Sequence, residues 1–141
     1  PLTLPCTQVL GVPELKSAMK SENPSRIAEA FFEAYQRALL DRDAPRIASH
    51  YAVPALIEFP GQAIPVSSSE QTEQFFRGAF AQYQGVTEAH AAIVVVAATG
   101  HSIWADVTWT YDGDVAGERN LYQLVHTDGA WKIAVLTPLN S

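Results

Sequence analysis

Four strand-like runs that follow one another constrain the fold more than any other feature of this sequence. Residues 86–98, 101–111, 117–127 and 130–138 are rich in Val, Ile, Thr, Trp and Tyr, which favour strands. Turn signals at Thr99-Gly100 and Asp128-Gly129 separate two of the pairs, and a longer loop over 112–116 separates the third. This order predicts an antiparallel meander of four strands.

The part of the chain before the meander has mainly helical periodicity. Apolar residues recur at three- and four-residue spacing after Asn23-Pro24, a typical helix start. Helices first and strands last predict an α+β domain. The expected elements are a helix over 25–41, a short helix after Asp43 with Tyr51 on its buried side, strands over 53–59 and 62–66, and a helix from a capping box at 67–70 to about 83.

The composition fits one domain with a large apolar surface. The chain has 141 residues, of which 48% are hydrophobic and 17% are charged, less charge than is usual. Three prolines interrupt residues 1–22. We therefore expect an N-terminal arm over 1–22 and a single domain over 23–141.

Charge and cysteine content exclude several classes of partner. The formal net charge is −6 and no basic stripe occurs, so neither nucleic acid nor an anionic membrane is an expected partner. A single cysteine, Cys6, fits a reducing compartment, and residues 1–11 do not resemble a signal peptide. We expect a cytoplasmic protein. The histidines lack metal-ligand spacing, so no metal and no cofactor are expected.

Two-residue turns predict which side chains of the meander share a face. A tight turn at Thr99-Gly100 pairs Ala98 with His101 and places His90 beside Trp109. Both faces are then apolar, whereas the helices cover only one of them, so we expect a homodimer through the other face. The alternative is that the N-terminal arm covers that face. The residues expected in the dimer interface are Trp104, Tyr122, Trp131 and Ile133.

Four segments carry a resemblance to a known superfamily: AYQRAL (34–39), HYA (50–52), IEFPG (57–61) and GAWKI (129–133). With the order of elements, they make the chain similar to the nuclear transport factor 2-like (NTF2-like) superfamily, in its ketosteroid isomerase and SnoaL-like polyketide cyclase branch. The resemblance implies a cone-shaped, cystatin-like fold. In that fold a curved antiparallel sheet wraps on three N-terminal helices and encloses an apolar pocket.

The resemblance also implies roles for single residues. Tyr35 falls at the position of the isomerase tyrosine that donates a hydrogen bond to the oxyanion. Phe59 falls at the position of the aspartate that acts as general base, and phenylalanine cannot take a proton. His90, predicted beside Trp109, is the residue that could replace the missing base. Tyr35 and His90 are therefore the candidate catalytic residues.

The sequence leaves two functions open. One is a small-molecule-binding protein with a hydrophobic pocket, acting as an isomerase, cyclase or dehydratase on an apolar compound with a carbonyl or hydroxyl group. The other is a non-catalytic dimeric ligand carrier or assembly module of the same fold. In both, the expected pocket residues are Phe31, Phe59, Phe76, Phe80, Val107, Trp109, Leu121, Gln123 and Leu136.

Overall fold

The computed structural model describes residues 23–113 and 115–139, so the expected arm over 1–22 lies outside the described residues. Helices precede the long strands, and the α+β class is confirmed. The elements are α2 (Pro24–Leu40), α3 (Ala44–Ala48), β1 (Tyr51–Phe59), β2 (Gln62–Val66), α4 (Ser69–Ala79), the 3₁₀ turn η1 (Phe80–Tyr83), β3 (Ala89–Ala98), β4 (Ser102–Tyr111), β5 (Glu118–Thr127) and β6 (Ala130–Pro138).

The helix starts follow from the capping residues that the sequence places there. The side-chain oxygen of Asn23 accepts hydrogen bonds from the backbone N–H groups of Ser25 and Arg26, at 2.8 and 3.4 Å. Ser68 caps α4 by accepting from the backbone N–H of Gln71 at 3.2 Å. Several boundaries differ from expectation, and β3 begins at Ala89 instead of residue 86. The third helix tightens into η1 after Ala79, and Tyr51 begins β1 instead of lying on α3.

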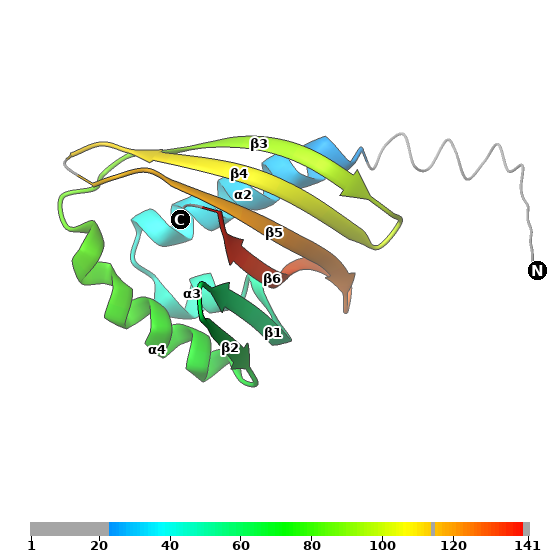
Figure 1. Ribbon diagram of the computed structural model, residues 1–141, viewed down its shortest axis with the longest axis horizontal. Helices are drawn as coiled ribbons and strands as arrows, with labels where there is room; N and C mark the ends of the chain where they lie inside the picture. Colours follow the sequence, from blue (N-terminus) through cyan, green and yellow to red (C-terminus); the bar gives the residue numbers. More distant parts are fainter. Residues whose placement is uncertain (1–22, 114, 140–141) are drawn as a thin grey trace, which may run out of the picture.

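The strands form one curved sheet in the order β2-β1-β6-β5-β4-β3. Neighbouring strands are antiparallel except β1 and β6, which are parallel and pair although β2, α4, η1 and three strands separate them in the sequence. Helix α2 lies across one face of the sheet behind β3 and β4, and α4 lies beside β1 and β2 at the other end (Figure 1). We call the face that α2 covers the inner face.

The predicted register of β3 against β4 is wrong by one residue. The turn spans Thr99 to Ser102, whose backbone groups bond at 2.8 Å, and a bulge follows between Val95 and Ala97. His90 therefore pairs with Thr110 instead of Trp109, and its side chain is exposed on the outer face. A one-residue shift moves every side chain of a strand to the opposite face.

The faces of β5 are also opposite to those expected. Val107 pairs with Asn120 and Ala105 with Tyr122, so the even-numbered residues of β5 point inward. Tyr122 is 2% exposed and Ile133 is fully buried, so neither lies in an outer interface. Trp131, near the start of β6, is partly buried and packs against the same core. Of the four expected interface residues, only Trp104 lies on the outer face.

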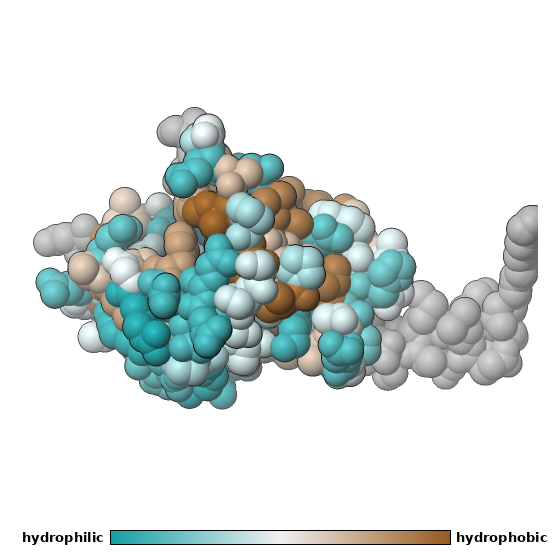
Figure 2. All heavy atoms as spheres, turned by 90° about the horizontal axis from the view of Figure 1, so that it is seen from below, coloured by the Kyte–Doolittle hydropathy of each residue, from teal (hydrophilic) through white to brown (hydrophobic). Residues whose placement is uncertain are grey.

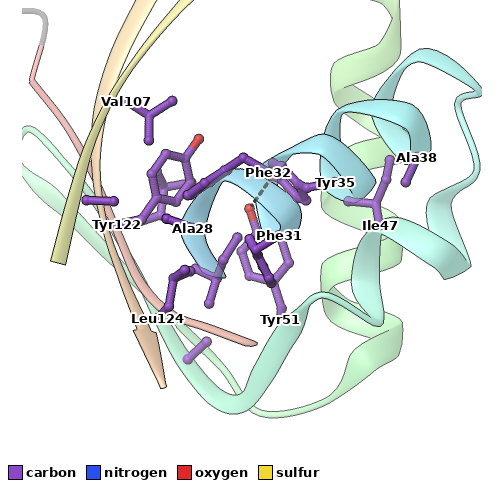
Figure 3. Close-up of a cluster of buried hydrophobic side chains, with 14 of the residues drawn as sticks. Ala28, Phe31, Phe32, Tyr35, Ala38, Ile47, Tyr51, Val107, Tyr122 and Leu124 are labelled. Atoms are coloured by element: carbon purple, nitrogen blue, oxygen red, sulfur yellow. Dashed lines mark hydrogen bonds between the residues drawn. The ribbon is translucent and has the colours of Figure 1, made fainter. Parts of the chain in front are cut away.

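The core lies between α2 and the inner face. Phe32 is fully buried there, with its ring centroid 4.8 Å from that of Tyr122 and 6.3 Å from that of Trp109. Figure 3 shows Phe31, Phe32 and Tyr35 of α2 pointing toward the strands. Apolar residues also reach the surface near the middle of the side that carries β1, β2 and α4 (Figure 2). Within the described ranges, no helix is long and apolar enough to cross a membrane.

Candidate functional site

A cavity of about 690 Å³ opens between the C-terminal half of α2, the α4–η1 segment and the end of the sheet where β4 passes to β5. Its volume is within the range of small-molecule sites. Aromatic and aliphatic side chains make up most of its wall, and a few polar groups interrupt them. The aromatic residues of the wall are Tyr35, Phe59, Phe75, Phe76, Phe80, Tyr83, Trp109, Tyr111 and Tyr122.

Glu118 is the carboxylate of this wall, and two phenols bind it. The Tyr111 hydroxyl donates to its Oε1 at 3.0 Å, and the Tyr83 hydroxyl donates to its Oε2. The two rings are T-shaped to each other, with centroids 5.5 Å apart. Burial raises the pKa of both tyrosines, and the Glu118 carboxylate raises each pKa further. Both phenols therefore stay neutral and act as donors to Glu118.

Tyr35 and Tyr122 line the cavity from the core side, and Tyr51 lies behind Tyr35. Tyr35 and Tyr51 share a hydrogen bond of 2.6 Å between their hydroxyl oxygens (Figure 3). The Tyr122 hydroxyl accepts from Trp109 Nε1 at 3.0 Å and from Asn120 Nδ2 at 3.1 Å. Burial raises the pKa of Tyr35 and of Tyr51, and it raises the pKa of Tyr122 to about 12. The three phenols therefore do not ionise near neutral pH, and those of Tyr35 and Tyr122, which line the cavity, can exchange hydrogen bonds with a ligand.

Arg42 fixes the segment that carries Tyr83. Its guanidinium donates to the carbonyl oxygens of Leu40 at 2.9 Å, Tyr83 at 2.7 Å and Val86 at 3.2 Å. The positive charge of Arg42 therefore lies at the C-terminal ends of α2 and η1, where backbone carbonyl groups without helical partners favour a cation. Arg42 lines the cavity, and its three bonds tie the end of η1 to the end of α2.

The structure brings together part of the predicted site. The predicted residues that line the cavity are Tyr35, Phe59, Phe76, Phe80, Trp109 and Leu136. Phe31 and Val107 are buried in the adjacent core and do not reach the wall. Because of the observed strand registers, three predicted site residues lie on the outer face: His90, Leu121 and Gln123. His90 is therefore separated by the sheet from the cavity that Tyr35 lines.

Sequence reasoning missed Glu118, Tyr83 and Tyr111. Tyr111 had a signal, because it lies two residues after Trp109 on one strand and so shares its face. Glu118 had none, because the loop before it is too long for a turn rule to set the facing of β5. In the described part of the chain, no three His, Cys, Asp or Glu side chains gather as a metal site.

A curved six-stranded sheet, with helices on one face and a cavity at one end, defines the cystatin-like class of NTF2-like domains. The chain belongs to this superfamily: the family model described as NTF2-like protein (DUF6841) matches residues 22–141. The comparison of the sequence with curated proteins gives no match.

Solved structures agree on the fold at low sequence identity. A candidate ketosteroid isomerase from Shewanella frigidimarina superposes with a TM-score of 0.67 at 16% identity, over 82% of this chain and 97% of that one. An NTF2-like protein of unknown function from Shewanella oneidensis gives 0.68 at 11%, over 82% and 98%. A candidate scytalone dehydratase from Novosphingobium aromaticivorans gives 0.63 at 12%, over 81% of each chain. These likenesses confirm the cystatin-like, NTF2-like fold that the sequence predicts, and they define the fold alone.

Proposed function

We propose that this protein binds a small, largely apolar compound with a carbonyl or hydroxyl group in the cavity. The observation that carries the proposal is the wall itself, where aromatic rings surround a few fixed polar groups. Apolar walls supply affinity, and a small number of placed donors and acceptors set the orientation of the ligand. Glu118 accepts from a ligand hydroxyl, and the Tyr122 hydroxyl, which accepts from Trp109 and Asn120, has its own hydrogen left to donate to a carbonyl.

A neutral fluorescent probe, N-phenyl-1-naphthylamine, tests this binding on the full chain. Ala79 lines the cavity, whereas its neighbour Ala81 is exposed and does not. Ala79→Trp should fill the cavity and weaken probe binding at least about tenfold, which corresponds to about 1.4 kcal/mol. Ala81→Trp, the matched control, should bind the probe as the unmodified chain does. Equal affinities for the two variants would remove the proposal.

A narrower form of the same proposal is that the protein acts on this compound as an isomerase, cyclase or dehydratase. Such a reaction needs a base within hydrogen-bond distance of the proton that it takes. Phe59 cannot be that base and His90 lies on the outer face, so among the described wall residues the group is Glu118. Hydrogen exchange next to the carbonyl of 2-tetralone in D2O measures this step. Catalysed exchange that Glu118→Gln abolishes supports an enzyme, and exchange at the uncatalysed rate supports binding alone.

A dimeric carrier or assembly module is the second candidate, and the outer sheet face favours it. Val94 is 60% exposed and Val96 is 57% exposed in the middle of β3. Trp104 and Leu121 are half-buried on the same face of the neighbouring strands. Isolated apolar residues on a surface are ordinary, but several apolar side chains on neighbouring strands of one face favour a partner. A second copy of the chain is the partner we propose.

A further inference from the structure

Glu118 and the rings around it form a negative corner of the cavity. We use the name acidic corner for Glu118, Tyr83, Tyr111 and Trp109. Glu118 begins β5 opposite Trp109, and Tyr111 follows Trp109 by two residues on β4, so one end of the sheet holds all three. Tyr83 reaches the same carboxylate from η1. Each carboxylate oxygen accepts one phenol hydrogen, and two lone-pair directions of the group remain for a further donor.

The two phenols do not balance the carboxylate charge. They are neutral donors, because burial and the carboxylate itself raise the pKa of both tyrosines. The ion pairs that the structure records within the described ranges join other acids to arginines. A carboxylate in an apolar wall is stabilised most by a cation that also donates hydrogen bonds.

The basic groups of the wall are engaged elsewhere. Arg42 donates to three backbone carbonyls at the ends of α2 and η1. Arg119 follows Glu118 directly, but its guanidinium reaches the outer face, where it binds both carboxylate oxygens of Asp106. Alternate residues of a strand point to opposite faces, so Glu118 and Arg119 are separated by the sheet.

The faces of the aromatic rings in the acidic corner have a negative electrostatic potential, as the carboxylate has. The face of an aromatic ring is electronegative and attracts a cation within about 6 Å of its centroid. The rings of Trp109 and Tyr111 are nearly parallel, at 5°, with centroids 6.5 Å apart, and the Tyr83 ring meets Tyr111 edge to face. Three electron-rich rings thus border one carboxylate.

We propose that the acidic corner binds the ammonium group of an otherwise apolar amine. The amine donates to Glu118 and lies against the rings, while its apolar part occupies the wall formed by Phe59, Phe75 and Phe80. A hydroxyl group can also donate to Glu118, but it brings no charge to compensate the carboxylate. The inference rests on the proposed binding of an apolar compound in the cavity, and it assigns to that compound a primary or secondary amine that is protonated at neutral pH.

A matched pair of probes tests the charge requirement. 1-Naphthylmethylamine is an ammonium ion at pH 7, and 1-naphthylmethanol has nearly the same shape but no charge. Titration calorimetry on the full chain should give at least about tenfold tighter binding for the amine, because hydrogen bonds between charged partners are the stronger ones. Glu118→Gln keeps the side-chain shape and should bring the two affinities together.

Glu88→Gln is the matched control. It removes one negative charge from an exposed residue that does not line the cavity, so the preference for the amine should persist. Equal affinities of the two probes in the unmodified chain, or a preference for the amine that Glu118→Gln retains, would overturn the inference. In either case binding that Ala79→Trp abolishes leaves the proposed function standing. Binding that Ala79→Trp does not change removes the proposed function itself.

Discussion

Gly117 lies so close to the neighbouring strand that no side chain fits there. A Cβ atom at this position would meet the backbone carbonyl oxygen of Trp109 at 2.7 Å, which requires the two strands to separate. Gly117 directly precedes Glu118, so the close approach helps to place the carboxylate opposite Trp109. The sequence signals a turn or a strand end at this glycine, but only the paired strands give the reason for it.

Gly117→Ala should therefore destabilise the fold by about 1–3 kcal/mol, the usual cost of forcing atoms into a packed site. Urea unfolding at pH 7 measures the free energy of unfolding. Gly100→Ala is the control, because a Cβ there meets nothing within 4 Å, and its effect should be small. Two variants of equal stability would show that the β4 and β5 backbones separate at little cost.

The buried phenol of Tyr122 makes the free energy of unfolding depend on pH in the alkaline range. Burial raises its pKa from 10.0 to about 12. Since the folded pKa lies above the unfolded one, the stability contributed by the neutral phenol is complete below pH 10 and is lost as the pH rises through 12. The expected loss for this group is about 2–3 kcal/mol. Tyr35 and Tyr51, whose pKa values are also raised, act in the same direction.

Urea unfolding at pH 8, 10 and 11.5 follows this loss. Tyr122→Phe should lower the free energy of unfolding at pH 8, because Trp109 and Asn120 lose their acceptor. The same variant should lose less stability between pH 10 and 11.5 than the unmodified chain. An equal loss in the two proteins would assign the alkaline transition to other groups.

Among the elements, the helices were predicted best and the facing of the strands worst. The Asn23 cap and the apolar stripe of α2 are local signals, and α2 ends within one residue of the expected boundary. The register of β3 depends on a bulge after Val95, which no local signal in the sequence marks. The facing of β5 cannot be set from the sequence, because the connection before it is too long for a turn rule. Both errors place candidate site residues on the wrong face, so the sequence predicts Gln123 and His90 at the cavity instead of Glu118.

Helix α4 contains a glycine that its packing does not require. The sequence suggests that Gly78 allows a helix and the sheet to approach closely, but a Cβ there meets nothing within 4 Å. Gly78→Ala should stabilise the protein by about 0.5–1 kcal/mol, because glycine loses more conformational freedom in a helix than alanine does. Thermal and urea unfolding measure the gain. A loss of stability would contradict the open space that the structure gives a Cβ at Gly78.

For the whole molecule, the fold class followed from the order of the elements and from four short segments of family-like sequence. Five of the nine expected pocket residues line the cavity, and so does the catalytic candidate Tyr35. The chemistry did not follow, because the family's aspartate position holds Phe59, and the carboxylate of the cavity comes from another strand. Long-range pairing decides which polar side chain enters a cavity, whereas apolar patterning decides only that a cavity wall forms.

The outer sheet face leads to a prediction about the assembled state. The outward side chains of β3, β4 and β5 include Val94, Trp104 and Leu121, and the bidentate Arg119–Asp106 pair lies among them. Because the Arg119–Asp106 pair is neutral as a whole, this face can pack on a copy of itself without leaving either of the two charges unpaired. Light scattering at micromolar concentration should therefore give twice the mass of one chain.

Val94→Lys should convert the dimer to a monomer, because each copy would place a charge against an apolar face, and we expect the dissociation constant to rise at least about tenfold. Val53→Lys is the matched control. Val53 is 50% exposed, close to the 60% of Val94, but it lies at the start of β1 and not in the middle of the outer face. The control should keep the mass of the dimer. A monomeric mass for the unmodified chain would contradict the dimer, and a dimer that Val94→Lys leaves intact would place the interface on another surface.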